Sequence, residues 1–260
     1  MKTQWIYGAG WLAILMLAMA NVSMADLSDG LVARWSFDSY ADPGHDDSGN
    51  GYDATVNGAT PAQGIWGNAL SFDGVDDEVV TPLFSGGSTP DAFTATCWFK
   101  SDESNGYLFG KYDDSTDTGW GVVLGSAVAD RFQIIVGVGD GDRTSLGTFV
   151  NDGAWHHLAL TRDGDLWDMY FDAVHDASLD LEMLAVDMLD SDLALTFMQR
   201  ADYFTAGFTS GYLDEVRIYD RVLSSAEIER LSVVPAPGAF LLGTIGFLYS
   251  GWRLRRRKAH

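Results

Sequence analysis

From about residue 30 to residue 223 the chain alternates between short apolar stretches and turn signals. Eight stretches have the length and pattern of β-strands, and eight Asx-Gly dipeptides, which tolerate the positive φ of tight hairpin turns, punctuate the region. The pattern predicts an all-β fold, an antiparallel sandwich of two sheets. Its strands are expected at Leu31–Phe37, Ala69–Phe72, Phe93–Lys100, Gly121–Leu124, Phe132–Val138, Trp155–Arg162, Leu166–Asp172 and Tyr212–Tyr219.

Helix is expected at one place in this region. Ser224 and Glu227 have the spacing of a capping box, in which each side chain bonds to the other residue's backbone N–H, and a short helix to about Leu231 follows. The segment Leu181–Leu189 also has apolar residues at helical spacing. A loop that carries apolar plugs into the core fits this segment equally well, so both interpretations stay open.

The first 25 residues have the pattern of a secretory signal peptide. Lys2 gives a positive start, Trp5–Met19 is an apolar run, and small residues at Ser23 and Ala25 suit signal peptidase. A transmembrane anchor is the alternative. We expect the mature protein to begin near Asp26 and its single domain to cover residues 26–232.

The last segment, residues 233–260, differs sharply from this domain. A proline-containing breaker precedes an apolar run from Gly238 to Trp252. As a helix these fifteen residues would be about 22 Å long, against roughly 30 Å of bilayer hydrocarbon. The positive-inside rule predicts that the terminal bases stay cytoplasmic and the domain lies outside. These bases are Arg253, Arg255, Arg256, Arg257 and Lys258.

This tail resembles the PEP-CTERM sorting signal of Gram-negative bacteria. The resemblance rests on Pro235 and Pro237, the short apolar run and the arginine-rich end. It implies export across the inner membrane, a C-terminal hydrophobic helix in that membrane, and processing by an exosortase-type enzyme. The protein would then be membrane-anchored, at the cell surface or extracellular. Ala236 replaces the central Glu of the signal, and a simple membrane anchor is the alternative.

Charge and cysteine content exclude several classes of partner and site. Residues 26–232 carry ten bases against all 37 acids, a net formal charge of −27. So acidic a domain repels nucleic acid and anionic lipid headgroups. A single cysteine, Cys97, excludes a disulfide framework, a multi-cysteine zinc site and an iron–sulfur cluster. His156 and His157 are adjacent on a predicted strand, so their side chains point to opposite faces and do not chelate one ion.

Several sequence blocks, in order along the chain, resemble the laminin-G-like, concanavalin A-like jelly rolls. The resemblance covers nearly all of residues 30–231 and implies a jelly-roll sandwich. It departs from the family at Asp172-Ala173, where Asp-Gly is usual, and at Met198-Gln199, where Ile-Gly is expected. The blocks are Gly30–Asp38, Asp47–Gly51, Ala69–Asp77, Phe93–Lys100, Trp155–Leu160 and Leu213–Ser224.

The resemblance also implies a structural Ca²⁺. The loop Asp46–Gly51 concentrates the carboxylate, amide and carbonyl oxygens that Ca²⁺ prefers. In the family a calcium ion commonly ties this loop to the first residues of the last strand. Carried over, the ligands are Asp47, Asn50 and Asp214, with Asp38 as a further candidate. The alternative is that these are solvated turn residues and a strand-end cap.

Three aromatic side chains are weak candidates for ligand binding. Trp98 lies with Lys100 on the strand face opposite Phe93, Ala95, Cys97 and Phe99, so it faces either the core or an outer, sugar-stacking surface. Trp120 and Tyr112, near an acidic loop, could form the rim of a site. For each residue, burial in the core is the competing interpretation.

Catalysis is not expected. The fold also houses laminarinase-type glycoside hydrolases, which resemble one another in a Glu-x-Asp-x-x-Glu strand motif that this chain lacks. The one close glutamate pair, Glu227 and Glu229, lies two apart on the predicted helix and does not converge. We expect an exported, surface-associated, non-catalytic binding module for polysaccharide or another surface protein. The alternatives are a hydrolase that uses aspartates and a purely structural surface or adhesion protein.

Overall fold

The computed structural model describes residues 26–82, 89–113, 115–124, 131–136, 143–149, 151–181, 192–200 and 207–234. The chain divides into two units, residues 1–30 and residues 31–260. In the first unit the described residues form a turn, in which the Asp29 amide donates to the Asp26 carbonyl. The predicted signal peptide and the sorting motif, with Pro235, Pro237 and Arg255 to Arg257, lie outside the described residues and stay predictions.

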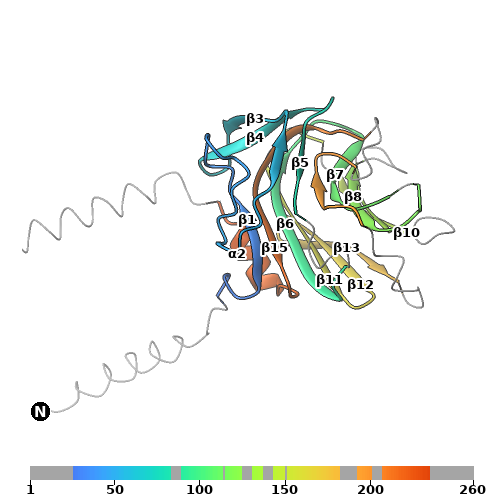
Figure 1. Ribbon diagram of the computed structural model, residues 1–260. Coiled ribbons are helices and arrows are strands. Elements are labelled where there is room, and N and C mark those ends of the chain that lie inside the picture. Colours follow the sequence, from blue (N-terminus) through green and yellow to red (C-terminus); the bar gives the residue numbers. More distant parts are fainter. Residues whose placement is uncertain are drawn as a thin grey trace, which may run out of the picture. The chain divides into compact units, whose positions relative to one another are not determined.

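The second unit is an antiparallel β-sandwich, as the sequence predicts (Figure 1). One sheet has the order β13-β12-β11-β6-β15-β4-β3, with β1 paired to β15, and the other has the order β10-β9-β8-β7-β14-β5-β2. We call them sheet A and sheet B. The strands are β1 Leu31–Trp35, β2 Thr55–Asn57, β3 Thr60–Gln63, β4 Asn68–Asp73, β5 Glu78–Val80, β6 Ala92–Lys100, β7 Gly106–Gly110, β8 Trp120–Leu124, β9 Arg131–Val136, β10 Arg143–Phe149, β11 His156–Asp163, β12 Leu166–Phe171, β13 Val174–Asp180, β14 Thr196–Phe197 and β15 Ser210–Tyr219.

The core lies between the sheets and is built by side-chain alternation. In β6 the residues Phe93, Ala95, Cys97 and Phe99 are buried in the core, which leaves Trp98 and its even-numbered neighbours on the outer face of sheet A. Burial raises the pKa of the Cys97 thiol far above its usual range, so this cysteine is a small apolar core residue.

A β-bulge in β15 shifts the alternation of core-facing and outward-facing side chains along the last strand. The register against β6 shifts between Asp214 and Arg217, and Glu215 takes a positive φ of 50°. The bulge inserts one residue, so that Leu213 and Val216 both face the core although they are three positions apart. Asp214, which precedes the shift, lies on the outer face and pairs with Trp98.

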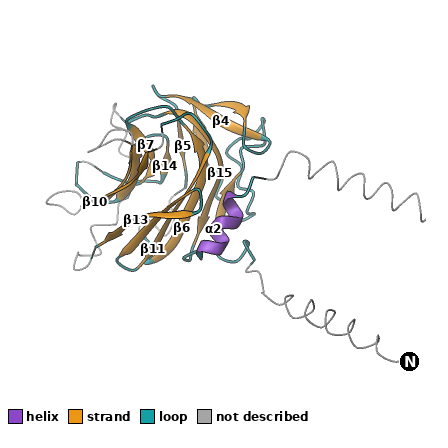
Figure 2. Ribbon diagram, turned by 180° about the vertical axis from the view of Figure 1, so that it is seen from behind, coloured by secondary structure: helices purple, strands orange, loops and turns teal. Residues whose placement is uncertain are grey.

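Helix α2, Ser225–Ser232, packs on the outer face of sheet A (Figure 2). It begins with the predicted capping box: the Ser224 hydroxyl accepts from the Glu227 amide, and the Glu227 carboxylate accepts from the Ser224 amide. Its Leu231 carbonyl accepts a hydrogen bond from the Trp98 indole at 3.2 Å. Within the described ranges, no helix has the length and apolar character needed to cross a membrane.

An ion pair and a capping box together stabilise the start of α2. Arg221 donates to Glu227 at 2.6 Å, and this ion pair, with the cap, holds the pKa of Glu227 at about 2. Because this pKa lies below that of the unfolded chain, the stabilisation is present above about pH 4.5 and is lost as the pH falls towards 2. We expect Glu227→Gln to lower the free energy of unfolding by about 1 kcal/mol at pH 7, measured by urea denaturation.

The control for this prediction lies two residues further along the helix. Glu229 is exposed, and Glu229→Gln should leave stability within about 0.5 kcal/mol of the wild type. The difference between wild type and Glu227→Gln should narrow between pH 4.5 and pH 2. A difference that is constant across this range would contradict the assigned role of the carboxylate.

The hairpin between β12 and β13 contains Asp172-Ala173, where the family pattern usually has Asp-Gly. Both residues have positive φ, 48° and 65°, a conformation that suits glycine and strains alanine. We expect Ala173→Gly to raise the free energy of unfolding by about 1 kcal/mol, seen as a higher Tm. Ala177→Gly, within β13, is the matched control and should lower the free energy of unfolding. A lower Tm for Ala173→Gly would show that the turn is not strained.

Each strand expected from the sequence is present, with ends that differ by a few residues. Met198, the other departure from the family pattern, also has a positive φ of 64°. In the ambiguous segment Leu181–Leu189, only Leu181 is described: it is buried, and its amide donates to the Asp165 carbonyl. The rest of that segment lies outside the described residues.

Candidate functional site

A polar groove lies at the beginning of β15. Its cavity volume is about 390 Å³, within the range of small-ligand sites. Adjacent strands of sheet A form its floor, since Tyr212 of β15 pairs with Ser71 of β4 on one side and with Lys100 of β6 on the other. Its walls include the loop residues Ser101, Asp102 and Gly153, together with Phe72, Ser210 and Gly211.

The half-buried ring of Tyr212 lines one side of this groove, and the half-buried ring of Trp155 packs beside it. The rings of Trp155 and Tyr212 lie 6.1 Å apart, inclined at 56°. The Lys100 ammonium group sits 5.3 Å from the centroid of the Tyr212 ring, which is a cation–π contact. The rings are therefore held in place while part of their surface remains open to solvent. Such partly exposed rings offer apolar faces on which a ligand ring can stack.

Hydroxyl and carboxylate groups form the other side. The Ser101 hydroxyl donates to the Ser210 carbonyl at 2.8 Å, and the Ser210 hydroxyl donates to the Glu103 carboxylate at 2.7 Å. Asp102 is exposed at the rim. Gly211, with a φ of 146°, lets β15 approach β6 so closely that a side chain there would meet the Lys100 carbonyl. The groove therefore combines stacking surfaces with closely spaced hydrogen-bonding groups.

The aromatic residues predicted to bind ligand lie elsewhere, and the structure corrects that interpretation. Trp98 is only 4% exposed, because Trp66 packs edge-on against it and α2 covers it. Trp120 is also 4% exposed, and packs in the core against Phe93. Tyr112 is buried too, and donates from its hydroxyl to Asp117 at 3.0 Å. None of these three rings presents a face to a sugar.

Of the predicted calcium ligands, Asp214 has the most unusual environment. It is fully buried, and its Oδ2 accepts from the backbone amides of Ile65 and Trp66 at 2.8 and 3.3 Å. Its Oδ1 is buried and has no hydrogen-bond partner among the described residues. Burial is the main cause that raises the pKa of this carboxyl to about 7. Such an oxygen could coordinate a cation or be protonated.

The other three predicted ligands are engaged in the local structure. The Asp47 carboxylate accepts from the Ser36 amide and hydroxyl at 3.1 and 2.6 Å. Asn50 donates from its side-chain amide to the carbonyls of residues 31 and 32, both at 3.0 Å. Asp38 accepts from the Asn68 amide at 2.8 Å. Each of these side chains therefore ties the early loop to a neighbouring segment.

The predicted set does not form one ligand cage in this structure. Among the described residues, the group whose three acidic ligand atoms all lie within 4.8 Å of one another is Asp73, Asp76 and Asp77, in the turn after β4. Two of these carboxylates already accept hydrogen bonds from backbone amides of that turn. Asp73 accepts from the Val75 amide and Asp77 from the Asp73 amide, both at 2.8 Å. Calcium binding by Asp47, Asn50, Asp214 and Asp38 stays a prediction.

The two adjacent histidines point to opposite faces, as predicted. His157 is fully buried against the Trp98 ring, and burial lowers its pKa to about 3, so it is neutral. His156 hydrogen-bonds to Asp172 and Asp152 at 2.9 and 3.1 Å. The hydrogen bond with Asp172 is the main reason why the pKa of His156 is raised. Both histidines thus have structural roles.

The residues of the groove had no signal in the sequence that set them apart. Trp155 and Tyr212 are the first residues of predicted strands, and the sequence did not show which face of the sheet their side chains would occupy. Lys100 was predicted to share a strand face with Trp98, without a decision whether that face lay in the core or on the surface. The groove forms because the ends of β4, β6 and β15 coincide, which is a property of the register between strands far apart in the sequence.

Comparison with solved structures gives the same fold. The binding domain of Paraclostridial Mosquitocidal Protein 1 is 17% identical, with a TM-score of 0.65 over 80% of this chain and 52% of that chain. The botulinum neurotoxin serotype D binding domain is 12% identical, with a TM-score of 0.61 over 79% and 52%. The chain thus spans about half the length of these structures. No curated protein sequence matches it significantly.

A third solved structure matches over nearly its whole length. Domain 4 of AbnA, a GH43 extracellular arabinanase from Geobacillus stearothermophilus, was solved in complex with arabinotriose. It is 20% identical, with a TM-score of 0.61 over 78% of this chain and 98% of that domain. The Laminin_G_3 family model matches residues 73–229, more than half of the chain. The chain therefore belongs to this family of the concanavalin A-like lectin/glucanases superfamily.

Proposed function

We propose that this protein is an exported, non-catalytic binding module that recognises a polysaccharide in the groove beside Tyr212. The observation that carries the proposal is the presence, in one groove, of the partly exposed Tyr212 ring, which packs beside Trp155, and of the hydroxyl groups of Ser101 and Ser210. Sugars present both apolar ring faces and closely spaced hydroxyl groups, so they match both sides of such a groove. The arabinotriose complex of AbnA domain 4 supports a carbohydrate ligand for this fold.

The net charge of the domain favours a neutral polysaccharide. A formal charge of −27 over residues 26–232 repels polyuronates and sulfated glycans over a Debye length of about 8 Å at physiological salt. Lys100 alone does not offset this charge, because Asp102 lies at the same groove. Another surface protein is the alternative partner. The tail would bring the domain to the cell surface through the inner membrane and an exosortase-type enzyme.

A glycan array tests this function directly. The protein should bind a class of neutral glycan saturably and release no reducing sugar from it on prolonged incubation. Binding to no glycan would redirect the proposal to a protein partner or a structural role. Release of sugar would overturn the non-catalytic assignment and favour a hydrolase that uses aspartates.

The calcium prediction has its own test. A structural Ca²⁺ at Asp214 predicts that EGTA lowers the Tm of the protein and that added Ca²⁺ restores it. Asp214→Asn should remove this dependence, whereas Asp76→Asn, in the other acidic group, should retain it. The measurement is a thermal melt at pH 7.5 with and without chelator. A wild-type Tm that does not respond to EGTA would contradict the calcium prediction.

A further inference from the structure

A short loop before β11 carries part of the polar groove. Within residues 151–155, Gly153 lines the groove and Trp155 packs its ring beside Tyr212. The Gly153 amide donates to the carbonyl of Ser101, another groove residue, at 3.1 Å. The shape of the groove and the position of its aromatic side therefore depend on what holds this loop in place.

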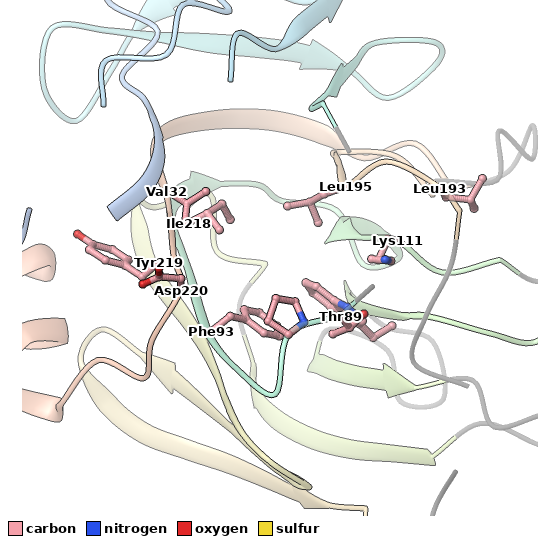
Figure 3. A pocket seen from close by; sticks show the side chains of 11 residues that line it. Val32, Thr89, Phe93, Lys111, Leu193, Leu195, Ile218, Tyr219 and Asp220 are labelled. Atoms are coloured by element: carbon pink, nitrogen blue, oxygen red, sulfur yellow. The ribbon is translucent and has the colours of Figure 1, made fainter. Parts of the chain in front are cut away.

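The loop borders the groove and no other ligand-sized cavity is needed for its role. The apolar pocket near Val32, Phe93 and Ile218 has a cavity volume of about 100 Å³, below the range of small-ligand sites (Figure 3). No residue of loop 151–155 lines that pocket. A displacement of the loop would therefore act on the groove.

One imidazole joins this loop to the turn between β12 and β13. His156, the first residue of β11, lies between two carboxylates. Its Nδ1 is 2.9 Å from Oδ2 of Asp172, in the turn, and its Nε2 is 3.1 Å from Oδ1 of Asp152, in the loop. The ring packs on Phe171 with 4.6 Å between ring centroids, and the side chain is 15% exposed. The imidazole therefore bridges two segments from a mostly buried position.

Both contacts can be hydrogen bonds only when the ring is protonated. An ionised carboxylate accepts hydrogen bonds and donates none, so each ring nitrogen must carry a hydrogen to bond to it. A neutral imidazole has one N–H, whereas the imidazolium has two. The hydrogen bond with Asp172 is the main cause that raises the pKa of His156 above its ordinary value of 6.5; burial opposes the shift, and the hydrogen bond with Asp152 adds to it.

Loss of the proton would break the contact with the loop rather than the contact with the turn. Asp172 is held firmly, because its carboxylate accepts from the His157 amide at 2.9 Å and its own amide donates to the His157 carbonyl at 2.8 Å. Asp152 is 57% exposed and accepts from the Ala154 amide within its own loop. A neutral His156 therefore keeps its hydrogen on Nδ1, and its Nε2 lone pair faces the Asp152 carboxylate, which is repulsive.

Granted the proposed glycan-binding function, on which this inference rests, we propose that His156 is a positioning residue for the groove. Its protonated ring holds loop 151–155 in the arrangement that binds glycan, and binding weakens as the pH rises and the ring loses its proton. The raised pKa fixes the direction. The bond to Asp152 is fully present below about pH 6.5 and is lost as the pH rises through the higher pKa of the folded protein.

The groups that face this imidazole come from four segments. On β6 and β12 they are the uncharged rings of Phe99 and Phe171. Among the described residues, the charged groups in contact with the ring are Asp172 in the turn and Asp152 in the loop. Carboxylates of ordinary pKa stay ionised between pH 6 and pH 9, so the charge that changes in this cluster is that of His156.

A proton titration tests the positioning role without any ligand. In NMR spectra of the full-length protein, the imidazole of His156 should titrate with a midpoint above pH 6.5. The indole N–H resonance of Trp155, identified by its absence in Trp155→Phe, should shift with the same midpoint. In His156→Gln this shift should vanish. Asp214, whose pKa is about 7, is retained in that variant, so a shift that persists there would overturn the proposal.

Glycan affinity at two pH values tests the consequence for binding. With the neutral oligosaccharide selected on the array, isothermal titration should show binding about fivefold weaker at pH 9 than at pH 6, as expected for the loss of one hydrogen bond. His156→Gln should bind weakly at both values. Asp152→Asn should bind tightly at both, because an amide can donate to a neutral imidazole and accept from a protonated one.

A control at another histidine separates this effect from a general response to pH. His175 is exposed, bonds to Asp168 at 2.9 Å and does not line the groove, so His175→Gln should keep the wild-type pH profile. Equal affinity of the wild type at pH 6 and pH 9, or the same pH dependence in His156→Gln, would overturn the proposal and leave the glycan-binding function standing. If no glycan binds at either pH, the glycan-binding function fails, and a Trp155 resonance that does not follow His156 would overturn the positioning role as well.

Discussion

Glu215→Gln should lower the free energy of unfolding by about 3 kcal/mol, the largest stability effect that we expect from one substitution. Glu215 is 4% exposed and receives hydrogen bonds from Arg34 at 3.0 Å and from Arg217 at 2.5 Å. Without its charge, two guanidinium groups would face each other in a largely buried site. Gln keeps the size of the side chain and the positive φ, so the effect isolates the charge.

Urea denaturation at pH 7 measures this loss. The control is a triple variant, Arg34→Met, Glu215→Leu and Arg217→Met, which removes every charge of the network at once. Because replacing a buried ion network with apolar residues is often neutral, the triple variant should recover most of the stability. A loss below about 0.5 kcal/mol for Glu215→Gln would mean that the network does not hold β1 to β15.

Tyr212→Ala should weaken glycan binding by about 30-fold, which corresponds to about 2 kcal/mol. The substitution removes a stacking face and also the cation–π contact that positions Lys100. Trp155→Ala should have a similar effect, because its ring packs against the ring of Tyr212 and holds it in position. Isothermal titration with an oligosaccharide identified on the array measures both losses.

Two controls separate this effect from general damage to the fold. Tyr212→Phe keeps the ring and should bind within about threefold of the wild type, since it loses one hydroxyl hydrogen bond at most. Tyr40→Ala removes an aromatic side chain that is 70% exposed and does not line the groove, and should bind normally. Unchanged binding by both Tyr212→Ala and Trp155→Ala would place the glycan elsewhere.

Much of the fold could be predicted from the chain because its signals are local. Strand periodicity and the Ser224 capping box each depend on a few neighbouring residues, and both are confirmed. Asp140-Gly141 lies outside the described residues, and the other Asx-Gly glycines all have positive φ: Gly30, Gly51, Gly58, Gly74, Gly106, Gly153 and Gly164. The strands that were missed are short or lack alternation. β14, for example, has two residues and exists because it pairs with β5 and β7.

The candidate site was harder to predict because it depends on the register between strands that are distant in the sequence. It also depends on which elements pack on the outer face of the sheet. Trp98 was predicted to share a strand face with Lys100, with core and outer surface both left open, and this face is the outer face of sheet A. Trp98 is nevertheless buried, because α2 and Trp66 pack on that face. Further along the same outer face, at Lys100 and Tyr212, the surface becomes accessible. No local pattern distinguishes Trp98 from Lys100.

A crystal structure with the oligosaccharide selected on the array would show whether the groove beside Tyr212 binds the glycan. We expect a sugar ring stacked on Tyr212 or Trp155, with its hydroxyl groups bonded to the wall at Ser101, Asp102 or Ser210, and an intact glycosidic bond. Density for the sugar on another surface would contradict the assignment of the groove. A cleaved glycan in the groove would contradict the non-catalytic function.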